Sequence, residues 1–280
     1  AGQSFLNNFY NADGYLKRTE EVLADLPALI NIYAARADYS QPLKKNGKLE
    51  AGVKTSLVNT DNAANYFDVV NHNNMINTNL TNRFLYKENI NAAYGNINQT
   101  YNRFELQAGL RVENTSVKGH QLGNEKRPDS SFRTNYTSLF PTLYLSFRLD
   151  SSGKNTLNAS YGRRIGRPYY QDLNPFVLLS DKYTYSSGNP FLRPQFTNSF
   201  KVAYNHGSTF TVALLYSHMK DFHSETVEQE GLVFIDRTGN IGSADYLGIA
   251  CNATLKPASW WTVYLYADVF NNYFKGNIGT

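Results

Sequence analysis

Three arginines, Arg163, Arg164 and Arg167, lie in the segment of the sequence that is richest in side chains able to bind a ligand. A guanidinium group presents a planar fork of N–H donors, which suits an anionic solute or a carboxylate of the protein itself. We expect these arginines to fix the local backbone by pairing with Asp172, Asp181 or carbonyl groups; the alternative is that they line a lumen and bind a solute. Asp and Asn beside Pro commonly cap turns. The neighbouring polar residues are therefore expected either to fix the local backbone or to contact a solute. These residues are Tyr170, Asp172, Asn174 and Asn189.

The connection that carries these residues is rich in proline and is expected to be ordered. It joins an alternating segment that ends near Arg164 to another that begins near Phe196. Each proline fixes its own φ and keeps the preceding residue out of the helical region. Connections longer than about 15 residues are usually functional or disordered, and this one lacks a disordered composition. Its four X-Pro pairs are Arg167-Pro168, Asn174-Pro175, Asn189-Pro190 and Arg193-Pro194.

Other chemistries find little support in the sequence. The single cysteine, Cys251, excludes an internal disulfide and a multi-cysteine metal site. His218 and His223 are expected on opposite faces of a strand, and the scattered loop carboxylates are expected to be solvated rather than calcium-bound. No G-x-S-x-G nucleophile context is present, and the net charge of +4 is too diffuse for nucleic acid. We therefore expect no enzymatic activity, no cofactor, no metal site and no nucleic-acid partner.

A two-residue alternation of apolar and polar side chains runs through most of the chain and indicates long β-strands. It is clearest around Leu143 and Leu145, which have polar neighbours on both sides. We expect an antiparallel meander of about ten strands, with long polar loops between the second and third strands and between the fourth and fifth. The expected strands are residues 30–41, 48–59, 83–96, 101–117, 134–150, 155–164, 196–205, 209–228, 232–256 and 260–272, and the two loops are residues 60–82 and 118–133.

Three details of this pattern carry predictions of their own. Residues 232–256 are counted as one strand with a bulge near 239–243, because only then do short turns and long connections stay at opposite ends. Pro141 inside a strand predicts a bulge or a missing ladder bond. Residues 1–29 are expected to form an irregular lead-in, in which 16–26 is either a short helix or an irregular strand, and residues 30–280 are expected to form the strand domain.

Strands of this length, with short turns at one end and long loops at the other, are typical of outer-membrane β-barrels. No run of about 18 apolar residues exists, so a helical membrane span is not expected. Aromatic residues make up 14%, which fits strands and the girdles at membrane interfaces, where Trp260 and Trp261 are well placed. The alternative is a large soluble β-sandwich, whose strands alternate too. As part of a barrel, a ten-stranded sheet has two open edges, which are expected to be paired, covered or joined to each other.

The proline-rich connection resembles a signature of the outer membrane protein β-barrel family of Bacteroidetes, whose members are similar to TonB-dependent receptors. The pattern in that family reads Y-x-R-R-I-x-R-P-x-Y-x-x-L-N-P-F, then G-N-P-x-L-x-P and T-N-S-F. The matching residues here are Tyr161, Arg163, Arg164, Ile165, Arg167, Pro168, Tyr170, Leu173, Asn174, Pro175, Phe176, Gly188, Asn189, Pro190, Leu192, Pro194 and Thr197 to Phe200. The resemblance covers about residues 30 to 275 and implies a location in the Gram-negative outer membrane.

Barrels of such plugged transporters have roughly 22 strands, so ten strands would be an incomplete barrel. The resemblance implies contact with outer-membrane lipid, a plug domain with TonB-type energy coupling, a small-molecule nutrient and a surface lipoprotein as partners. Neither a plug sequence nor an energy-coupling box nor a signal peptide is found in the chain. Two hypotheses about function follow: nutrient uptake through an energy-coupled receptor, or surface adhesion or assembly without transport.

Overall fold

Within the residues that the structure describes, the regular secondary structure is all β-strand. The computed structural model describes residues 2–44, 46–124, 128–175 and 177–276. Ten long strands in these ranges correspond to the ten expected from the alternation, which confirms the all-β prediction. No helix in the described part is long and apolar enough to cross a membrane. The long strands are β3 (Ala28–Leu43), β4 (Gly47–Val70), β6 (Asn82–Tyr101), β7 (Phe104–Leu122), β8 (Ser130–Arg148), β9 (Asn155–Gly166), β12 (Gln195–His206), β13 (Phe210–Glu230), β14 (Val233–Ala258) and β15 (Trp261–Gly276).

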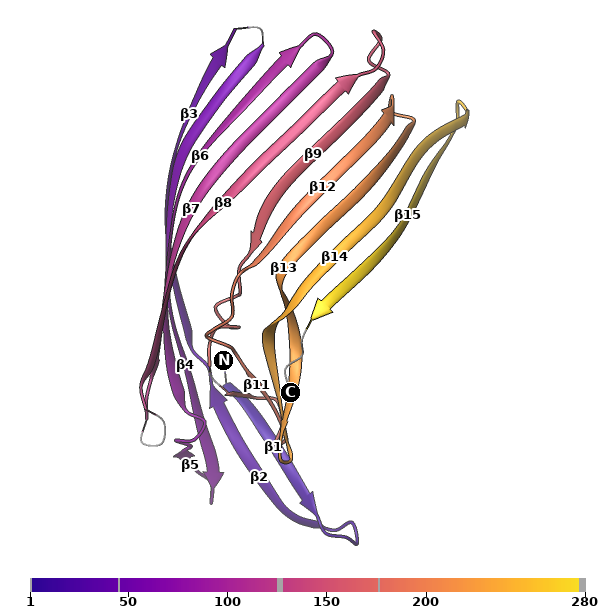
Figure 1. Cartoon of the computed structure of the whole chain (residues 1–280). Coiled ribbons are helices and arrows are strands. Elements are labelled where there is room, and N and C mark those ends of the chain that lie inside the picture. The colour runs from indigo at the N-terminus through magenta and orange to yellow at the C-terminus, as the bar shows by residue number, and fades with distance from the viewer. Residues whose placement is uncertain (1, 45, 125–127, 176, 277–280) are drawn as a thin grey trace.

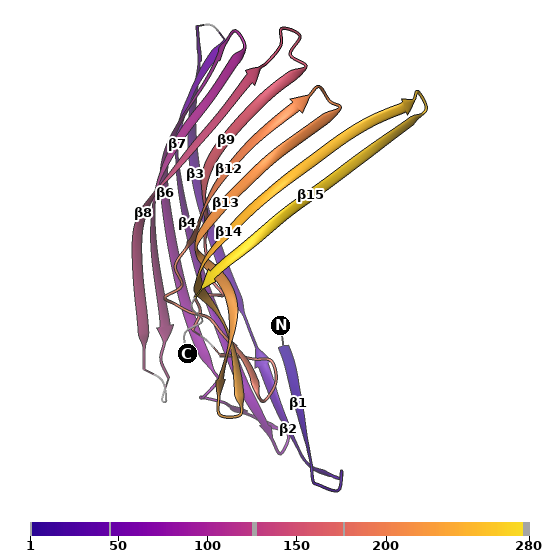
Figure 2. The same cartoon turned by 45° about the vertical axis from the view of Figure 1, so that its right-hand side comes forward.

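Each long strand pairs antiparallel with the next long strand along the chain, from β3 to β15. The strands form a curved wall, with short turns at its upper end and the long connections at its lower end (Figure 1). Among the described residues, β3 pairs only with β4 and β15 only with β14. The expectation of paired or covered edges was therefore wrong for this part of the chain, because the curvature carries the two edge strands apart (Figure 2).

The register collects the apolar side chains into one band on the convex face of the wall. Leu106 of β7 lies opposite Leu145 of β8. Farther along the wall, Val202 of β12 lies opposite Leu214 of β13, which in turn lies opposite Ile249 of β14. Directly opposed side chains share a face, so the apolar rows continue from strand to strand. A convex apolar band over a sheet of this kind is the surface that an outer-membrane barrel presents to lipid.

The concave face is polar near the short turns and carries hydrogen-bonded charges. The Arg36 guanidinium donates from Nε to the hydroxyl of Tyr94, 3.0 Å away, and also pairs with the carboxylate of Asp38. The side chain of Tyr94 shares this face with Phe84 and Tyr86 because all three are in phase along β6. These aromatic residues of β6 therefore face inward rather than toward lipid.

Several strands extend beyond the limits set by the alternation. β4 continues to Val70, and β7 continues to Leu122. The short strand β5 (Asn73–Ile76) pairs back on β4, so most of residues 60–82 are strand rather than loop. Beyond the lipid band neither face must be apolar, so the alternation fades although the backbone ladder goes on. The prediction of two long polar loops was therefore wrong in extent.

The first residues form a β-hairpin, not an irregular lead-in. β1 (Gly2–Tyr10) pairs antiparallel with β2 (Leu16–Asp25). β2 then pairs with the distal part of β4, and Pro27 separates it from β3, which pairs with the proximal part of the same strand. The expectation of an irregular lead-in was wrong because the strand residues of this hairpin show no simple alternation, but of the two alternatives for 16–26 the strand is confirmed. The division between 1–29 and 30–280 stays a prediction.

Two irregularities of the strand pairing lie where the sequence predicts them. The β13–β14 ladder shifts register around Asp221, opposite residues 240–242, and Asp221 has a positive φ of 56°. Gly242 has a φ of 142°, which residues with a side chain rarely adopt. The β8–β9 ladder ends at Thr142, immediately after Pro141, although β8 stays paired with β7 as far as Ser130. The distal half of β8 thus separates from β9 and leaves room for the proline-rich connection.

Candidate functional site: a pocket beneath the proline-rich loop

The connection between β9 and β12, here called the bridging loop (residues 167–194), folds into the concave side of the wall (Figure 1). It contains a small hairpin of β10 (Val177–Leu179) and β11 (Thr184–Ser187). β11 pairs in parallel with β14, through Thr184 opposite Phe234. On the other side, the Lys182 ammonium pairs with Glu20 of β2 at 2.9 Å. The loop therefore spans the interior from the N-terminal hairpin to β14.

Arg167 anchors the start of the bridging loop to the inner wall. Its guanidinium pairs with the carboxylate of Glu113 on β7 and lies 3.8 Å from that of Glu88 on β6. The Glu113 side chain is only 5% exposed and also accepts a hydrogen bond of 2.6 Å from Nη2 of Arg111. Burial lowers the pKa of the Arg167 guanidinium, and the carboxylate of Glu88 opposes this change. The anchor is thus a largely desolvated cluster of alternating charges.

The expectation that the arginines pair with Asp172 or Asp181 was wrong. The Asp172 carboxylate instead accepts a hydrogen bond of 3.1 Å from the backbone N–H of Tyr169. Asp181 accepts hydrogen bonds from the backbone N–H groups of Tyr183 and Thr184, which hold its pKa below the ordinary value. Sequence proximity is a poor guide here, because backbone donors in the tight turns of the loop satisfy both carboxylates first.

The two halves of the signature motif pair with each other inside the loop. The N–H of Gly188 donates to the carbonyl of Asn174 at 2.8 Å, and the N–H of Asn189 donates to the carbonyl of Asp172 at 2.5 Å. The side-chain oxygen of Asn189 accepts from the N–H of Phe191 at 3.0 Å. Asp172, Asn174 and Asn189 therefore build the loop through these bonds, and their contact with a solute stays a prediction.

Arg193 anchors the other end of the loop at the β13–β14 bulge. Its guanidinium pairs with the Asp221 carboxylate at 2.7 Å. Its backbone N–H donates to the side-chain oxygen of Asn240 at 2.8 Å, and its carbonyl accepts from the side-chain nitrogen of the same residue at 2.9 Å. The Nε2 atom of His223 lies 2.6 Å from that carbonyl. The bulge thus presents polar groups inward at the point where the loop returns to the wall.

The underside of the loop is apolar and forms the main buried cluster of the described residues. Leu173 and Leu192 insert into it and are 5% and 6% exposed. They pack with aromatic residues of the inner wall, Tyr66, Phe84 and Tyr86. Tyr170, one of the residues singled out in the sequence, packs against the edge of this cluster. Hydrophobic burial therefore adds to the two charged anchors in holding the loop against β4 and β6.

The remaining two arginines of the motif stand apart from this cluster. The Arg163 guanidinium lies 4.7 Å from the centroid of the Phe196 ring, where β8 leaves β9. Arg164 is exposed on β9. Of the seven residues expected in the site, the fold brings together Arg167, Tyr170, Asp172, Asn174 and Asn189, and leaves Arg163 and Arg164 on the strand.

A pocket of about 210 Å³ opens between the bridging loop and the inner face of β6–β8. Its lining includes Glu88, Arg167 and Phe191, of which Phe191 is 81% exposed. An exposed aromatic ring beside buried charges suits a solute with an apolar face and polar groups. The sequence analysis missed Phe191 and did not assign a role to Glu88. Within the described residues, no group of three or more His, Cys, Asp or Glu side chains is placed to hold a metal ion.

The model of a family described as the outer membrane protein beta-barrel family matches residues 1–279 of this chain. The chain belongs to this family. Its location is therefore the Gram-negative outer membrane, and the predictions of family, fold class and location are confirmed, while an origin in Bacteroidetes stays a prediction. The match includes the N-terminal hairpin, which the resemblance seen in the sequence did not cover. No curated protein matches the chain.

Solved structures of a transporter and of uptake receptors resemble this member of the family in fold. The copper transporter OprC aligns with a TM-score of 0.65 and 16% identity over 91% of this chain. The ferric yersiniabactin uptake receptor FyuA from Yersinia pestis aligns with a TM-score of 0.61 and 12% identity over 92%. The siderophore receptor PiuA from Acinetobacter baumannii aligns with a TM-score of 0.52 and 10% identity over 92%. The chain spans only 38% to 39% of the length of these three structures, so it corresponds to part of their barrel.

Proposed function

We propose that this chain is the barrel region of a TonB-dependent-type receptor that takes up a small-molecule nutrient. The observation that carries the proposal is the pocket beneath the bridging loop, which lies on the concave side of a barrel wall whose fold is shared with uptake receptors. In such barrels the short turns face the periplasm and the long connections face outward. The pocket is then open to solutes that enter from outside. We further propose that the bridging loop contacts the solute, mainly through Phe191.

This proposal implies three partners of the chain: a plug domain, TonB-type energy coupling and a surface lipoprotein. The barrel wall alone supplies no energy source for transport against a gradient. A plug that closes the barrel and couples to the inner membrane would supply one. Support for these partners comes only from the shared fold of the wall, and their test is the sequence of the whole gene.

Phe191→Ala in the full-length protein is expected to lower the rate of nutrient uptake about fivefold to tenfold at limiting solute, because a stacking contact is lost. The measurement is depletion of nutrients from defined medium by cells that lack the gene, complemented with wild type or variant. Tyr169→Ala is the matched control, since Tyr169 is an exposed aromatic of the same loop outside the pocket. If wild-type complementation restores the depletion of no solute, the chain is a surface or assembly protein and not a transporter.

A further inference from the structure

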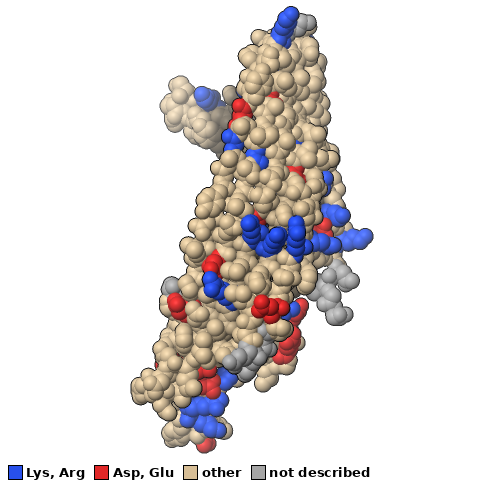
Figure 3. Space-filling model, turned by 90° about the vertical axis from the view of Figure 1, so that its left-hand side faces the viewer, with Lys and Arg blue, Asp and Glu red and all other residues tan. Residues whose placement is uncertain are grey.

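Three basic side chains form one continuous row across the convex face of the wall. Lys87 of β6 lies opposite Lys118 of β7, and Lys118 lies opposite Arg133 of β8. All three side chains are exposed. A band of Lys and Arg side chains crosses this face below a largely uncharged area (Figure 3). None of the three makes an ion pair with a carboxylate of the described residues.

Such a row is unfavourable for the protein alone. Like charges directly opposite each other on neighbouring strands destabilise a sheet. Elsewhere on the molecule several arginines are paired with carboxylates, for example Arg83 with Asp61 and Arg111 with Glu113. Among the described acidic groups, Asp61 pairs with Arg83, and Asp129 lies 3.2 Å from the His120 ring. An external anion would relieve the repulsion within the row.

The row lies at the level of the lipid headgroups. Between the last apolar row, which contains Val112 and Leu139, and the basic row lie two rows of Asn, Ser and Thr. A strand rises about 3.4 Å per residue and tilts by about 40° in these barrels, which places Lys118 roughly 35 Å from Phe104 along the membrane normal. The apolar band of such barrels is about 25 Å tall, so the basic row stands roughly 10 Å beyond the hydrocarbon on the side of the long connections.

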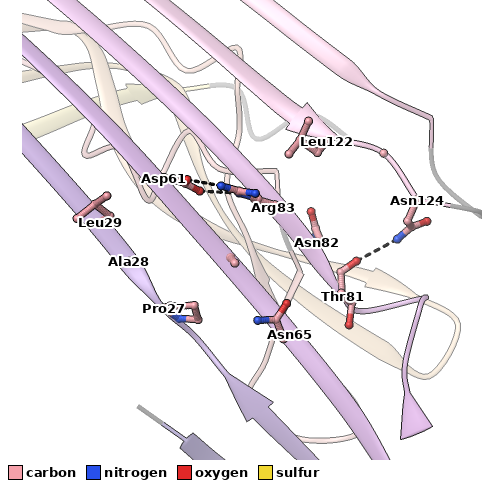
Figure 4. A pocket seen from close by; sticks show the side chains of 12 residues that line it. Pro27, Ala28, Leu29, Asp61, Asn65, Thr81, Asn82, Arg83, Leu122 and Asn124 are labelled. Atoms are coloured by element: carbon pink, nitrogen blue, oxygen red, sulfur yellow. Dashed lines mark hydrogen bonds and ion pairs between the residues drawn. The ribbon is translucent and has the colours of Figure 1, made fainter.

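The surface beside the row is hollowed rather than flat. A groove of about 390 Å³ is lined by Lys87, Lys118 and His120, and it extends to Leu29 of β3. A second hollow of about 560 Å³ adjoins it through Leu29 and Asp61, where Arg83 holds Asp61 in a two-pronged ion pair (Figure 4). These hollows give room for a bulky headgroup, with apolar surface on one side and cationic groups on the other.

From the charge, level and shape of this surface, we infer that the row Lys87–Lys118–Arg133 binds the phosphate groups of a lipid headgroup in the outer leaflet. The ammonium and guanidinium groups neutralise the phosphates, and the adjoining groove accepts the rest of the headgroup. The row lies on the convex face, and of its three residues only Arg133 also lines the pocket beneath the bridging loop. Its role is to fix a lipid against β6–β8 and thereby to stabilise the wall.

The test uses the full-length protein in detergent micelles and titrates it with bisphosphorylated lipid A or with dephosphorylated lipid A. The wild type is expected to bind the phosphorylated lipid more tightly. The triple variant Lys87→Gln, Lys118→Gln and Arg133→Gln is expected to weaken that binding by about tenfold or more. The matched control is Lys54→Gln, Lys154→Gln and Lys201→Gln, which removes the same charge from exposed lysines off the row and is expected to bind like the wild type.

Three results would overturn the inference. The first is equal binding of phosphorylated lipid by the wild type and the triple variant. The second is equal affinity of the wild type for the phosphorylated and dephosphorylated lipids. The third is displacement of the lipid by inorganic phosphate at equal concentration, which would show that the row binds free phosphate and not specifically a lipid headgroup.

Discussion

Arg167→Met is expected to release the bridging loop from the inner wall. The variant leaves the carboxylates of Glu88 and Glu113 facing each other without their shared cation, and Glu113 is almost fully buried. Removal of one partner from a buried ion pair costs about 3 to 5 kcal/mol. We expect amide hydrogen exchange in residues 168–194 of the full-length protein, measured by mass spectrometry, to become about 100-fold faster or more.

Two further variants show whether charge or packing is responsible. Arg83→Met breaks an ion pair whose arginine is 53% exposed, so it is expected to change stability by less than about 1 kcal/mol. Addition of Glu88→Gln to Arg167→Met removes a carboxylate whose only ion-pair partner among the described residues was Arg167, and is expected to restore part of the protection. If the double variant exchanges as fast as Arg167→Met alone, lost packing and not lost charge governs the docking of the loop.

Gly188→Ala is expected to separate the two halves of the signature motif. A Cβ atom on Gly188 would lie 2.3 Å from the carbonyl oxygen of Asn174 and 2.7 Å from that of Asp172. These neighbours are backbone atoms, which cannot rotate away as a side chain can, so the hydrogen bonds of the Gly188 and Asn189 N–H groups must break. We expect a cost of about 3 kcal/mol to the docked loop, in the upper range for overpacking, and a corresponding loss of exchange protection at these two amides.

Gly162→Ala is the matched control for this prediction. Gly162 lies on β9, and a Cβ there would meet nothing closer than a methyl carbon of Thr142 at 4.0 Å. The substitution is therefore expected to leave the exchange of residues 168–194 unchanged. Protection of the loop that survives in Gly188→Ala would contradict the close pairing of the motif.

The long strands were predictable because lipid imposes a strict pattern on one face. Segments such as 134–150 must be apolar at every second position, and the β13–β14 bulge followed from the parity of turns and loops. Where the wall leaves the lipid, this constraint disappears, so the distal ends of β4 and β7 and the whole β1–β2 hairpin left no alternation to read. Stability there comes from backbone pairing and from contacts between distant parts of the chain.

The site was only half predictable for a related reason. Pro168, Gly188 and Asn189 act through local backbone geometry, which the motif shows directly. The partners of Arg167 are Glu88 and Glu113, which are distant in sequence and reach it only through the register of β6 and β7. Glu88 did leave a signal, because a carboxylate that interrupts an apolar face needs a partner. No such signal marks Phe191, because it is an exposed aromatic residue at a variable position of the motif.

The central claim is that the bridging loop is docked inside an outward-facing barrel and exposes Phe191 above a buried Leu192. The most direct test is labelling of intact cells by a membrane-impermeant maleimide, with Phe191→Cys and Leu192→Cys compared in a full-length protein in which Cys251 and any other cysteine are serine. The account predicts rapid labelling of Phe191→Cys and strong protection of Leu192→Cys, because the two side chains are 81% and 6% exposed. Equal labelling of both positions would show that the loop is not docked, and failure to label Phe191→Cys would show that the pocket does not open to the outside.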